Sequence, residues 1–192
     1  MKTPVYIFIF LLVALLFPVQ AQSQTEAPAT IYTGAKFTRL YFKDCYIDGT
    51  TDFIFGPSTA LFEDCIIHSK RNSYVTAAST PKEAKYGYVF KHCKLTAEPG
   101  VDKVYLGRPW RPYAYTLFIE CELGKHIVSA GWHNWGKQSN EETARYMEYK
   151  NTGEGANASE RVAWSKQLTK KEAEAVTVDA IFRTQSNWNP ID

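Results

Sequence analysis

The chain has 192 residues, of which 45% are hydrophobic and 15% are aromatic. This composition suits a globular domain and excludes a chain that stays disordered for lack of apolar side chains. The formal net charge of +2 and the lack of a long Lys/Arg run argue against a nucleic-acid-binding protein, so a small or carbohydrate substrate is expected.

The first segment, residues 1–21, is predicted to be a secretory signal peptide. Lys2 precedes an apolar run over residues 5–17, and residues 19–21 supply a small-residue cleavage site. The run is shorter than the roughly 20 residues that a membrane-spanning helix needs, so no membrane span is expected after cleavage. We therefore expect a secreted chain, extracellular or periplasmic, that starts near Gln22.

Four segments then repeat one pattern: an aromatic residue, two mostly polar residues, a cysteine, a variable residue and an aliphatic residue. The segments begin at Phe42, Phe62, Phe90 and Phe118. Their cysteines are 20, 28 and 28 residues apart, which predicts a solenoid whose coils each contribute the same strand. Since such strands bury their apolar side chains only by stacking, the predicted fold is all-β, a right-handed parallel β-helix.

The cysteines of the repeat have two interpretations. Export and an even number favour disulfides, with three possible pairings. However, all four occupy the same repeat position, which is typical of a column of small core side chains, so we favour free buried thiols. Without a Cys-x-x-Cys motif or a nearby histidine pair, no metal site is predicted. The histidines are scattered and are expected to lie on the surface or to be hydrogen-bonded: His68, His92, His126 and His133.

The segments Gly49–Gly56 and Tyr105–Trp110 each place one charged residue in an apolar, aromatic stretch. Asp52 lies in the first and Arg108 in the second. A guanidinium within reach keeps a partly buried carboxylate ionised, so the two form a candidate nucleophile and its partner. The alternative is that the first segment is a core strand with Asp52 as its cap.

The repeat register favours the first interpretation. Asp52 lies ten residues before Phe62. Arg108 likewise lies ten residues before Phe118, and Thr80 occupies the matching place on the coil between them. Stacked strands are about 4.8 Å apart, so the two backbones are expected roughly 10 Å apart, a gap that the two side chains can span.

The carboxy-terminal part contains two further aromatic and polar segments, residues 131–135 and 146–153. They fit a carbohydrate-facing groove and a packed last coil equally well. Thr169, followed by Glu172, predicts a short capped helix that packs against the solenoid or closes its end.

Four motifs resemble those of the pectin methylesterase (pectinesterase) family in sequence, order and separation: Gly49–Gly56, Leu106–Trp110, Gly131–Trp132 with Trp135, and Glu148–Tyr149 followed by Asn151–Gly153. The resemblance covers residues 30–192 and corresponds to the later half of a family domain. It implies a hydrolase that removes methyl esters from the galacturonate units of pectin, methylated homogalacturonan. Such an aspartyl esterase acts in cell wall modification and pectin catabolism, and it uses no metal or organic cofactor.

The resemblance also implies roles for individual residues. Asp52 corresponds to the nucleophile and Arg108 to the residue that pairs with it. Four more side chains are expected to line the sugar groove: Thr51, Phe55, Trp110 and Trp132.

The family also uses a second carboxylate and glutamine side chains, which come from a motif before the nucleophile. In this chain Pro28 stands in place of the glutamine and Ala29 in place of the acid. Residues 22–29 are therefore expected to be a seam between the signal peptide and a domain truncated at its N-terminal end, with impaired activity. The exposed first coil then predicts an oligomer or an aggregate.

Two alternatives remain. One is a catalytically inactive β-helix remnant that binds acidic polysaccharide through Arg108 and the tryptophans. The other is a polysaccharide lyase on the same fold, which is weaker because the carboxylates that would bind calcium are not clustered in the sequence.

Overall fold

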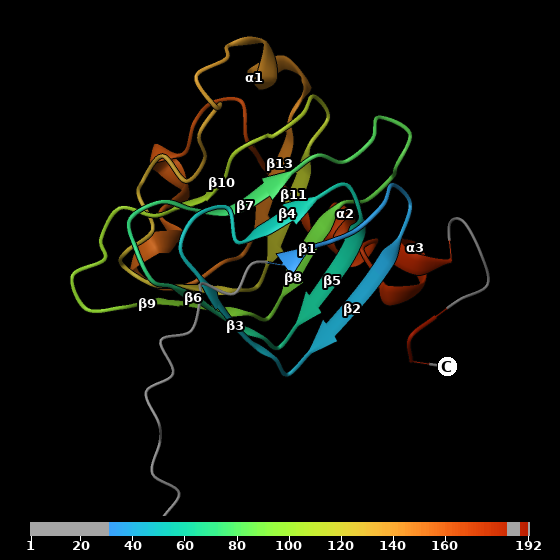
Figure 1. Ribbon diagram of the computed structural model, residues 1–192, viewed down its shortest axis with the longest axis horizontal. Helices are drawn as coiled ribbons and strands as arrows, with labels where there is room; N and C mark the ends of the chain where they lie inside the picture. Colours follow the sequence, from blue (N-terminus) through green and yellow to red (C-terminus); the bar gives the residue numbers. More distant parts are fainter. Residues whose placement is uncertain (1–30, 184–188, 192) are drawn as a thin grey trace, which may run out of the picture.

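The structure is a computed structural model that describes residues 31–183 and 189–191. The first twelve strands step in turn through three parallel sheets, which we call A, B and C (Figure 1). Each full turn of the chain therefore forms one coil, and the predicted parallel β-helix is confirmed. The predicted signal peptide and the seam over residues 22–29 lie outside the described residues.

The three sheets differ in length. Sheet A contains β1 (Ile31–Tyr32), β4 (Ile54–Gly56), β7 (Tyr74–Ala78) and β10 (Tyr105–Gly107). Sheet B contains, in spatial order, β2 (Arg39–Lys43), β5 (Thr59–Glu63), β8 (Tyr88–Lys91), β11 (Tyr115–Ile119), β13 (Arg145–Tyr149) and β14 (Lys166–Gln167). Sheet C contains β3 (Tyr46–Gly49), β6 (Ile66–Ser69), β9 (Lys94–Ala97) and β12 (Glu122–Leu123).

The described residues also form five short helical segments outside the sheets. They are α1 (Ser139–Thr143), η1 (Glu154–Ala156), η2 (Ala158–Glu160), α2 (Lys170–Glu174) and α3 (Val178–Phe182). In the part of the chain that the structure describes, no helix has the length and apolar character needed to cross a bilayer.

The aromatic residue of the repeat forms a stacked column inside sheet B. Successive rings of Phe42, Phe62, Phe90 and Phe118 are stacked, with centroids 4.8, 4.5 and 4.4 Å apart. The column forms because parallel strands in register place identical positions directly above one another. On β13 the same register position is taken by Glu148, so the column of rings ends there.

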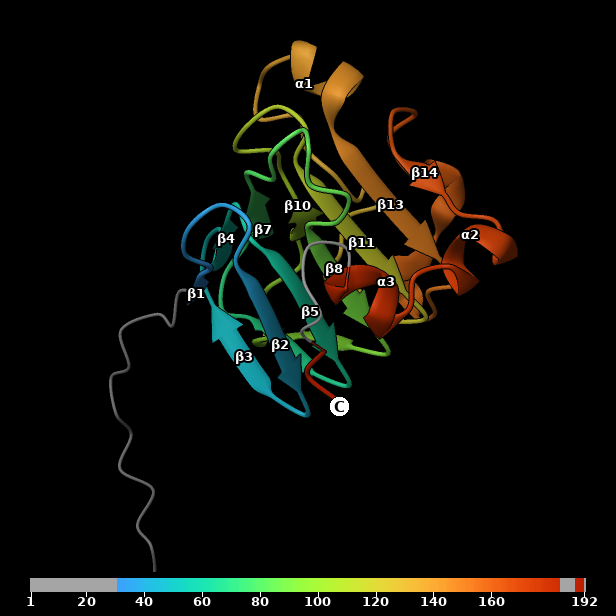
Figure 2. The ribbon, with the colours of Figure 1, turned by 90° about the vertical axis from the view of Figure 1, so that its right-hand side faces the viewer.

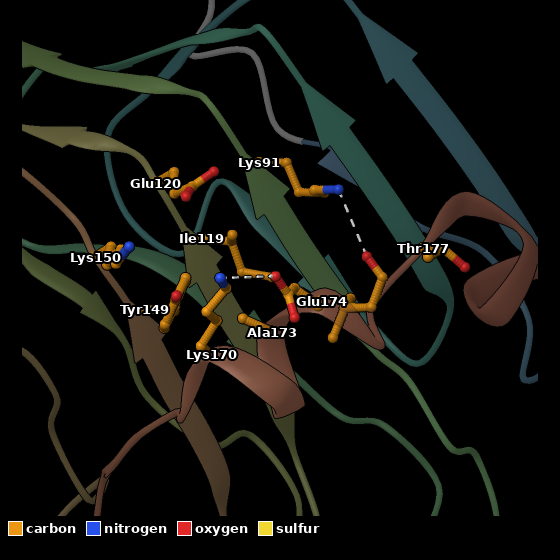
Figure 3. Close-up of a pocket in the computed structure, with 10 residues that line it drawn as sticks. Lys91, Ile119, Glu120, Tyr149, Lys150, Lys170, Ala173, Glu174 and Thr177 are labelled. Carbon is orange, nitrogen blue, oxygen red and sulfur yellow. Dashed lines mark hydrogen bonds and ion pairs between the residues drawn. The ribbon is translucent and has the colours of Figure 1, made fainter.

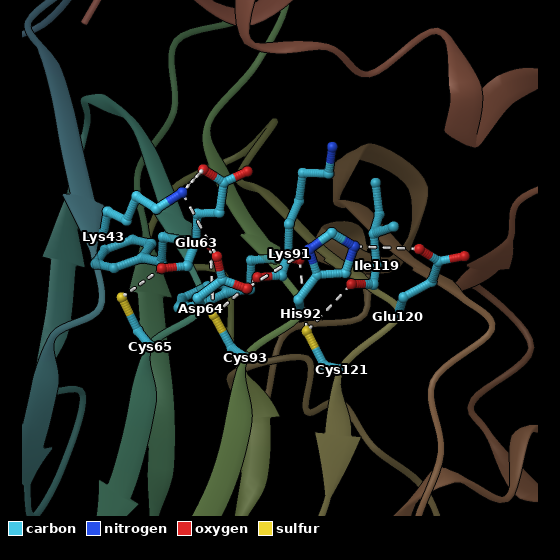
Figure 4. Close-up of polar contacts among 12 residues, drawn as sticks. Lys43, Glu63, Asp64, Cys65, Lys91, His92, Cys93, Ile119, Glu120 and Cys121 are labelled. Carbon is cyan, nitrogen blue, oxygen red and sulfur yellow. Dashed lines mark hydrogen bonds and ion pairs between the residues drawn. The ribbon is translucent and has the colours of Figure 1, made fainter. Parts of the chain in front are cut away.

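The cysteines form a second column at the turn from sheet B to sheet C (Figure 4). All four are free thiols, as predicted; Cys65, Cys93 and Cys121 are buried, and Cys45 on the first coil is partly exposed. The residue before each cysteine has a positive φ of 51–54°, which makes the sharp turn between the sheets: Asp44, Asp64, His92 and Glu120. Because these turn residues point outward, they place charged side chains on adjacent coils, and His92 lies 3.7 Å from Asp64 and 3.2 Å from Glu120.

The middle strands of sheet B, β5, β8 and β11, are buried on both faces, because α2 and α3 cover the outer side of the sheet (Figure 2). Outward-facing side chains such as Leu61 and Leu117 pack in one cluster with Ala173 of α2 and Phe182 of α3. The predicted capping box of α2 is present: the Thr169 side chain accepts from a backbone N–H while Glu172 bonds back to residue 169. The helices thus cover the side of the solenoid and do not close its end.

A hollow of about 270 Å³ lies between α2 and sheet B (Figure 3). Its lining includes Lys91 and Lys170, and the ammonium group of Lys91 donates to the carbonyl oxygen of Val176 at 3.5 Å. This hollow shares no lining residue with the pocket around Asp52 described below.

Candidate active site

Asp52 and Arg108 meet on the outer side of sheet A. Asp52 immediately precedes Phe53 and β4, and Arg108 follows β10, with β7 between the two strands. Nε of Arg108 donates to Oδ1 and Oδ2 of Asp52 at 3.0 and 3.2 Å, and Nη2 donates to Oδ2 at 2.6 Å. Charge-assisted bonds of this forked kind are strong and fix orientation. The Asp52 side chain remains 19% exposed, so the carboxylate is held but still accessible.

The register beneath this contact differs from the one expected. Strand pairing places Tyr74 and Tyr105 level with Asp52, so Arg108 lies three residues further along its coil than predicted. Thr80 does not occupy the matching place; it is buried, and its hydroxyl accepts the backbone N–H of residue 115. Counting from the repeat gave the wrong register because the connections from sheet A to sheet B vary in length. These connections are residues 57–58, 79–87 and 108–114. The contact forms because the long Arg108 side chain reaches back toward Asp52.

Aromatic rings enclose the guanidinium of Arg108. Its central carbon lies 3.9 Å from the ring centroid of Tyr74 and 3.8 Å from that of Trp135. Stacking of this kind is attractive and restricts the guanidinium to the plane that faces Asp52. Neither ring was predicted as part of the site. Tyr74 could have been found only with the correct register, whereas Trp135 belongs to a motif singled out in the sequence.

A pocket of about 290 Å³ opens beside the carboxylate. It is lined by Thr51, Asp52, Phe55, Ala77, Trp110 and Trp135. Phe55 packs against Trp110 at 5.8 Å between centroids and against Tyr32 at 5.0 Å, so an aromatic wall continues along the surface. Trp110 also lines an adjoining hollow of about 370 Å³, which contains the cations Lys36 and Arg111. The two hollows form a groove that is aromatic near Asp52 and basic further away.

Three of the four predicted groove residues lie at this pocket, and one does not. Thr51, Phe55 and Trp110 line it, and the exposed Thr51 accepts a hydrogen bond from the Ser73 hydroxyl at 2.8 Å. Trp132 is 1% exposed and lies in the core, where its Nε1–H donates to Oε1 of Glu148 at 3.2 Å. The expectation that Trp132 lines the groove is corrected by this burial: the backbone turn after it presents Trp135 to the pocket instead.

A family model described as Pectinesterase matches residues 21–185. The chain belongs to the pectinesterase family. Pectinesterase 31 from Arabidopsis thaliana is 45% identical over 136 residues, which cover 70% of this chain and 43% of that protein.

Solved structures give the same result. The pectin methylesterase from carrot superimposes with a TM-score of 0.73 at 33% identity, covering 80% of this chain and 54% of its own. The deglycosylated pectin methylesterase from Aspergillus niger gives 0.67 at 29% identity, covering 76% of this chain and 48% of its own. The chain thus spans about half the length of these pectinesterase relatives.

The pocket of this pectinesterase-family chain contains one carboxylate. Asp52 is the single acidic side chain that lines it among residues 31–183 and 189–191. Pro28 and Ala29, the positions at which the family's glutamine and acid were expected, lie outside the described residues. The described part of the site therefore offers an accessible carboxylate, its cationic partner and an aromatic groove.

Proposed function

We propose that this chain hydrolyses methyl esters on the galacturonate units of pectin, with Asp52 as the nucleophile. The proposal is supported above all by the forked hydrogen bonds from Arg108, which hold an accessible carboxylate at the edge of the pocket. Membership of the pectinesterase family supports the same reaction.

The reaction proceeds in two steps at Asp52. A carboxylate oxygen attacks the ester carbonyl carbon, and collapse of the tetrahedral adduct breaks the bond to the methoxy oxygen, which leaves as methanol after taking a proton from water. The product on the enzyme is a mixed anhydride between Asp52 and the sugar carboxyl group. Water then attacks the anhydride, which releases galacturonate and regenerates the Asp52 carboxylate with loss of two protons, one of which neutralises the hydroxide left when methanol formed.

The groove has a composition that suits an acidic sugar polymer. Phe55 and Trp110 offer flat apolar surfaces beside the nucleophile, and Lys36 and Arg111 provide positive charge for carboxylates already freed of their methyl groups. A pectin methylesterase that covers 79% of this chain has been solved in complex with hexasaccharide VII, and we extend oligosaccharide binding to this groove.

The expected rate is low. Pro28 and Ala29 stand where the family's glutamine and acid are expected. A general acid and an oxyanion hole each contribute about a hundredfold or more to the rate, so we expect methanol release at least about a thousandfold below that of a family member that carries both. The substrate, pectin, is a component of cell walls and lies outside the cell. The apolar segment over residues 5–17, part of the predicted signal peptide, supports export of the chain to it.

The deciding experiment measures methanol release from methylated pectin by wild-type chain and two matched variants. Asp52→Asn should lower the rate by more than about a hundredfold, because an amide cannot act as the nucleophile. Asp64→Asn is the control, since Asp64 also has a positive φ, 54° against 49° for Asp52, but lies at the exposed turn between sheets B and C. Equal rates in all three proteins would show that Asp52 is not the nucleophile.

The second candidate function is binding of acidic polysaccharide without catalysis, which the single carboxylate of the pocket and the basic part of the groove favour. Retention of the wild-type chain on immobilised demethylated pectin, together with no methanol release above that of Asp52→Asn, would select this function. The variant Arg111→Ala should then elute earlier.

A further inference from the structure

The loop over residues 131–137 places Trp135 against Arg108, and it does so with an unusual backbone. Trp135 has a φ of 62°, a conformation that costs energy for a residue with a bulky side chain. Its backbone N–H donates to Nδ1 of His133 at 3.0 Å. A side chain two residues earlier thus stabilises the turn that presents the indole ring.

His133 also contacts the other side of the Arg108 site. Its imidazole packs edge-on against Tyr74 and Tyr105, with ring centroids 5.4 and 5.3 Å apart, and its backbone N–H donates to the carbonyl oxygen of Gly107 at 3.1 Å. Tyr74 is the ring on one side of the guanidinium and Trp135 is the ring on the other. One histidine therefore supports both aromatic contacts of Arg108.

We propose that His133 is a positioning residue for the Asp52–Arg108 pair, an inference that rests on the proposed esterase function. His133 fixes the Trp135 turn and the two rings around Arg108, and Arg108 in turn orients the carboxylate of Asp52. A backbone N–H can only donate, so Nδ1 must carry no proton. The arrangement therefore requires the neutral imidazole with its proton on Nε2.

The surroundings of His133 favour that neutral form. Burial, and secondly the positive charge of Arg108, lower the pKa of His133 below its usual 6.5. Tyr74 and Tyr105 contribute rings to its contacts. Glu141, the next acid along the chain, lines the same hollow as His133 and accepts a hydrogen bond from Asn134 at 2.7 Å. Because the native pKa is depressed, the arrangement is complete above about pH 6.5 and is lost as the pH falls through the native value.

Two variants separate the acceptor from the ring. His133→Asn keeps a side-chain oxygen that accepts an N–H two residues on, the same turn that the neighbouring Asn134 makes with Gly136 at 2.8 Å, and it does not titrate. His133→Phe keeps an aromatic ring but has no acceptor. His92→Asn is the control, because this histidine lies half-exposed at the sheet B to sheet C turn.

The activity readout is kcat/KM for methyl ester hydrolysis between pH 4.5 and 8. We expect His133→Phe to lose about tenfold at pH 7.5, the equivalent of one hydrogen bond, and His133→Asn to lose less than about threefold. In the wild type, protonation of His133 should contribute to the fall of kcat/KM toward low pH. His133→Asn should lose this contribution, whereas His92→Asn should keep the wild-type pH profile. If kcat/KM of His133→Asn fell toward low pH as it does in the wild type, the proposal would be overturned.

An NMR experiment on the same proteins does not depend on activity. Histidine ¹⁵N shifts should show the wild-type His133 protonated at Nε2 and not at Nδ1 at pH 7.5, and amide exchange at Trp135 should accelerate about tenfold in His133→Phe. The Nδ1-protonated form, or unchanged exchange at Trp135, would overturn the positioning role. If the NMR results hold while wild-type protein releases no methanol, the esterase function fails and the role of His133 in holding Trp135 and Arg108 stands.

Discussion

Two arginine–carboxylate pairs in this chain have the same chemistry and opposite surroundings. Asp52–Arg108 lies at the pocket, with side chains 19% and 20% exposed, whereas Glu148–Arg161 lies in the interior, with both side chains 3% exposed. The closest contact is similar in the two, 2.6 Å and 2.8 Å. The contact distance therefore does not distinguish the pair at the pocket, which we propose to be reactive, from the pair in the interior.

The hydrogen bonds around each pair do distinguish them. Each oxygen of Glu148 accepts from Arg161 and from a second donor, the indole of Trp132 on Oε1 and the amide of Asn151 on Oε2. Arg161 also donates to backbone carbonyl oxygens, among them that of Gly155 at 2.6 Å. The hydrogen bonds described for the Asp52 carboxylate all come from Arg108, and the carboxylate also lines the pocket. A carboxylate with one anchored side and one open side can attack a substrate, and a carboxylate bonded throughout can only hold the fold together.

The largest expected effect is on stability, in the structural pair. Glu148→Gln leaves the Arg161 charge buried without its counter-ion, so the free energy of unfolding should fall by about 3–5 kcal/mol. Asp52→Asn, in the open pair, should change it by less than about 1 kcal/mol because that pair is partly solvated. Urea denaturation followed by circular dichroism measures both. Equal losses of unfolding free energy in the two variants would mean that the Asp52–Arg108 pair stabilises the fold as much as the interior pair does.

Acid should act on the stability of the fold and on the pocket through different histidines, His126 and His133. Burial, and secondly His68, lower the pKa of His126 to about 4. Since the neutral form is favoured in the native state, its contribution to stability is complete above about pH 6.5 and is lost as the pH falls through about 4. The melting temperature should therefore fall by several degrees between pH 6.5 and 4, and this slope should flatten in His126→Leu. His133→Asn should flatten the slope less, because the pKa of His133 is also lowered but this histidine is less buried than His126.

The fold could be predicted from the sequence because the repeat is local. Phe42, Phe62, Phe90 and Phe118 recur with a cysteine three residues later, and strands that share such a pattern stack in register. The order of the coils followed from the same pattern. Counting from the aromatic residue of the repeat then placed Asp52 and Arg108 on coils two apart, which sheet A confirms.

The detailed register of the site could not be predicted in this way. The loops between sheets A and B vary in length, so Thr80 was wrongly aligned and Tyr74 was missed. The sequence also could not show which of Trp132 and Trp135 lines the pocket. Trp132 and Trp135 are three residues apart, yet one ring lies in the core and the other at the pocket, because the chain turns between them through a positive φ at Trp135.

A smaller effect is expected at the N-cap of α2, which lies on the opposite side of sheet B from the interior column. Thr169→Ala removes the acceptor for the backbone N–H of Glu172 and should lower the free energy of unfolding by about 1 kcal/mol. Methanol release and the tautomer of His133 should stay unchanged, because α2 shares no residue with the pocket. Thr169→Ser, which keeps the hydroxyl, is the matched control and should restore most of the stability.

The smallest expected effect concerns a third pair, on the surface of α2. Lys170 and Glu174 are 3.6 Å apart, one helical turn from each other, and their side chains are 76% and 64% exposed (Figure 3). Water solvates both charges whether or not they meet, so Glu174→Gln should change the free energy of unfolding by less than about 0.5 kcal/mol. Together with Glu148→Gln and Asp52→Asn, this variant completes a series of three ion pairs whose side chains are increasingly exposed to solvent. If the loss at Glu174 matched that at Glu148, burial would not be what separates a structural pair from a solvated one, and the comparison between the two arginine sites would lose its physical basis.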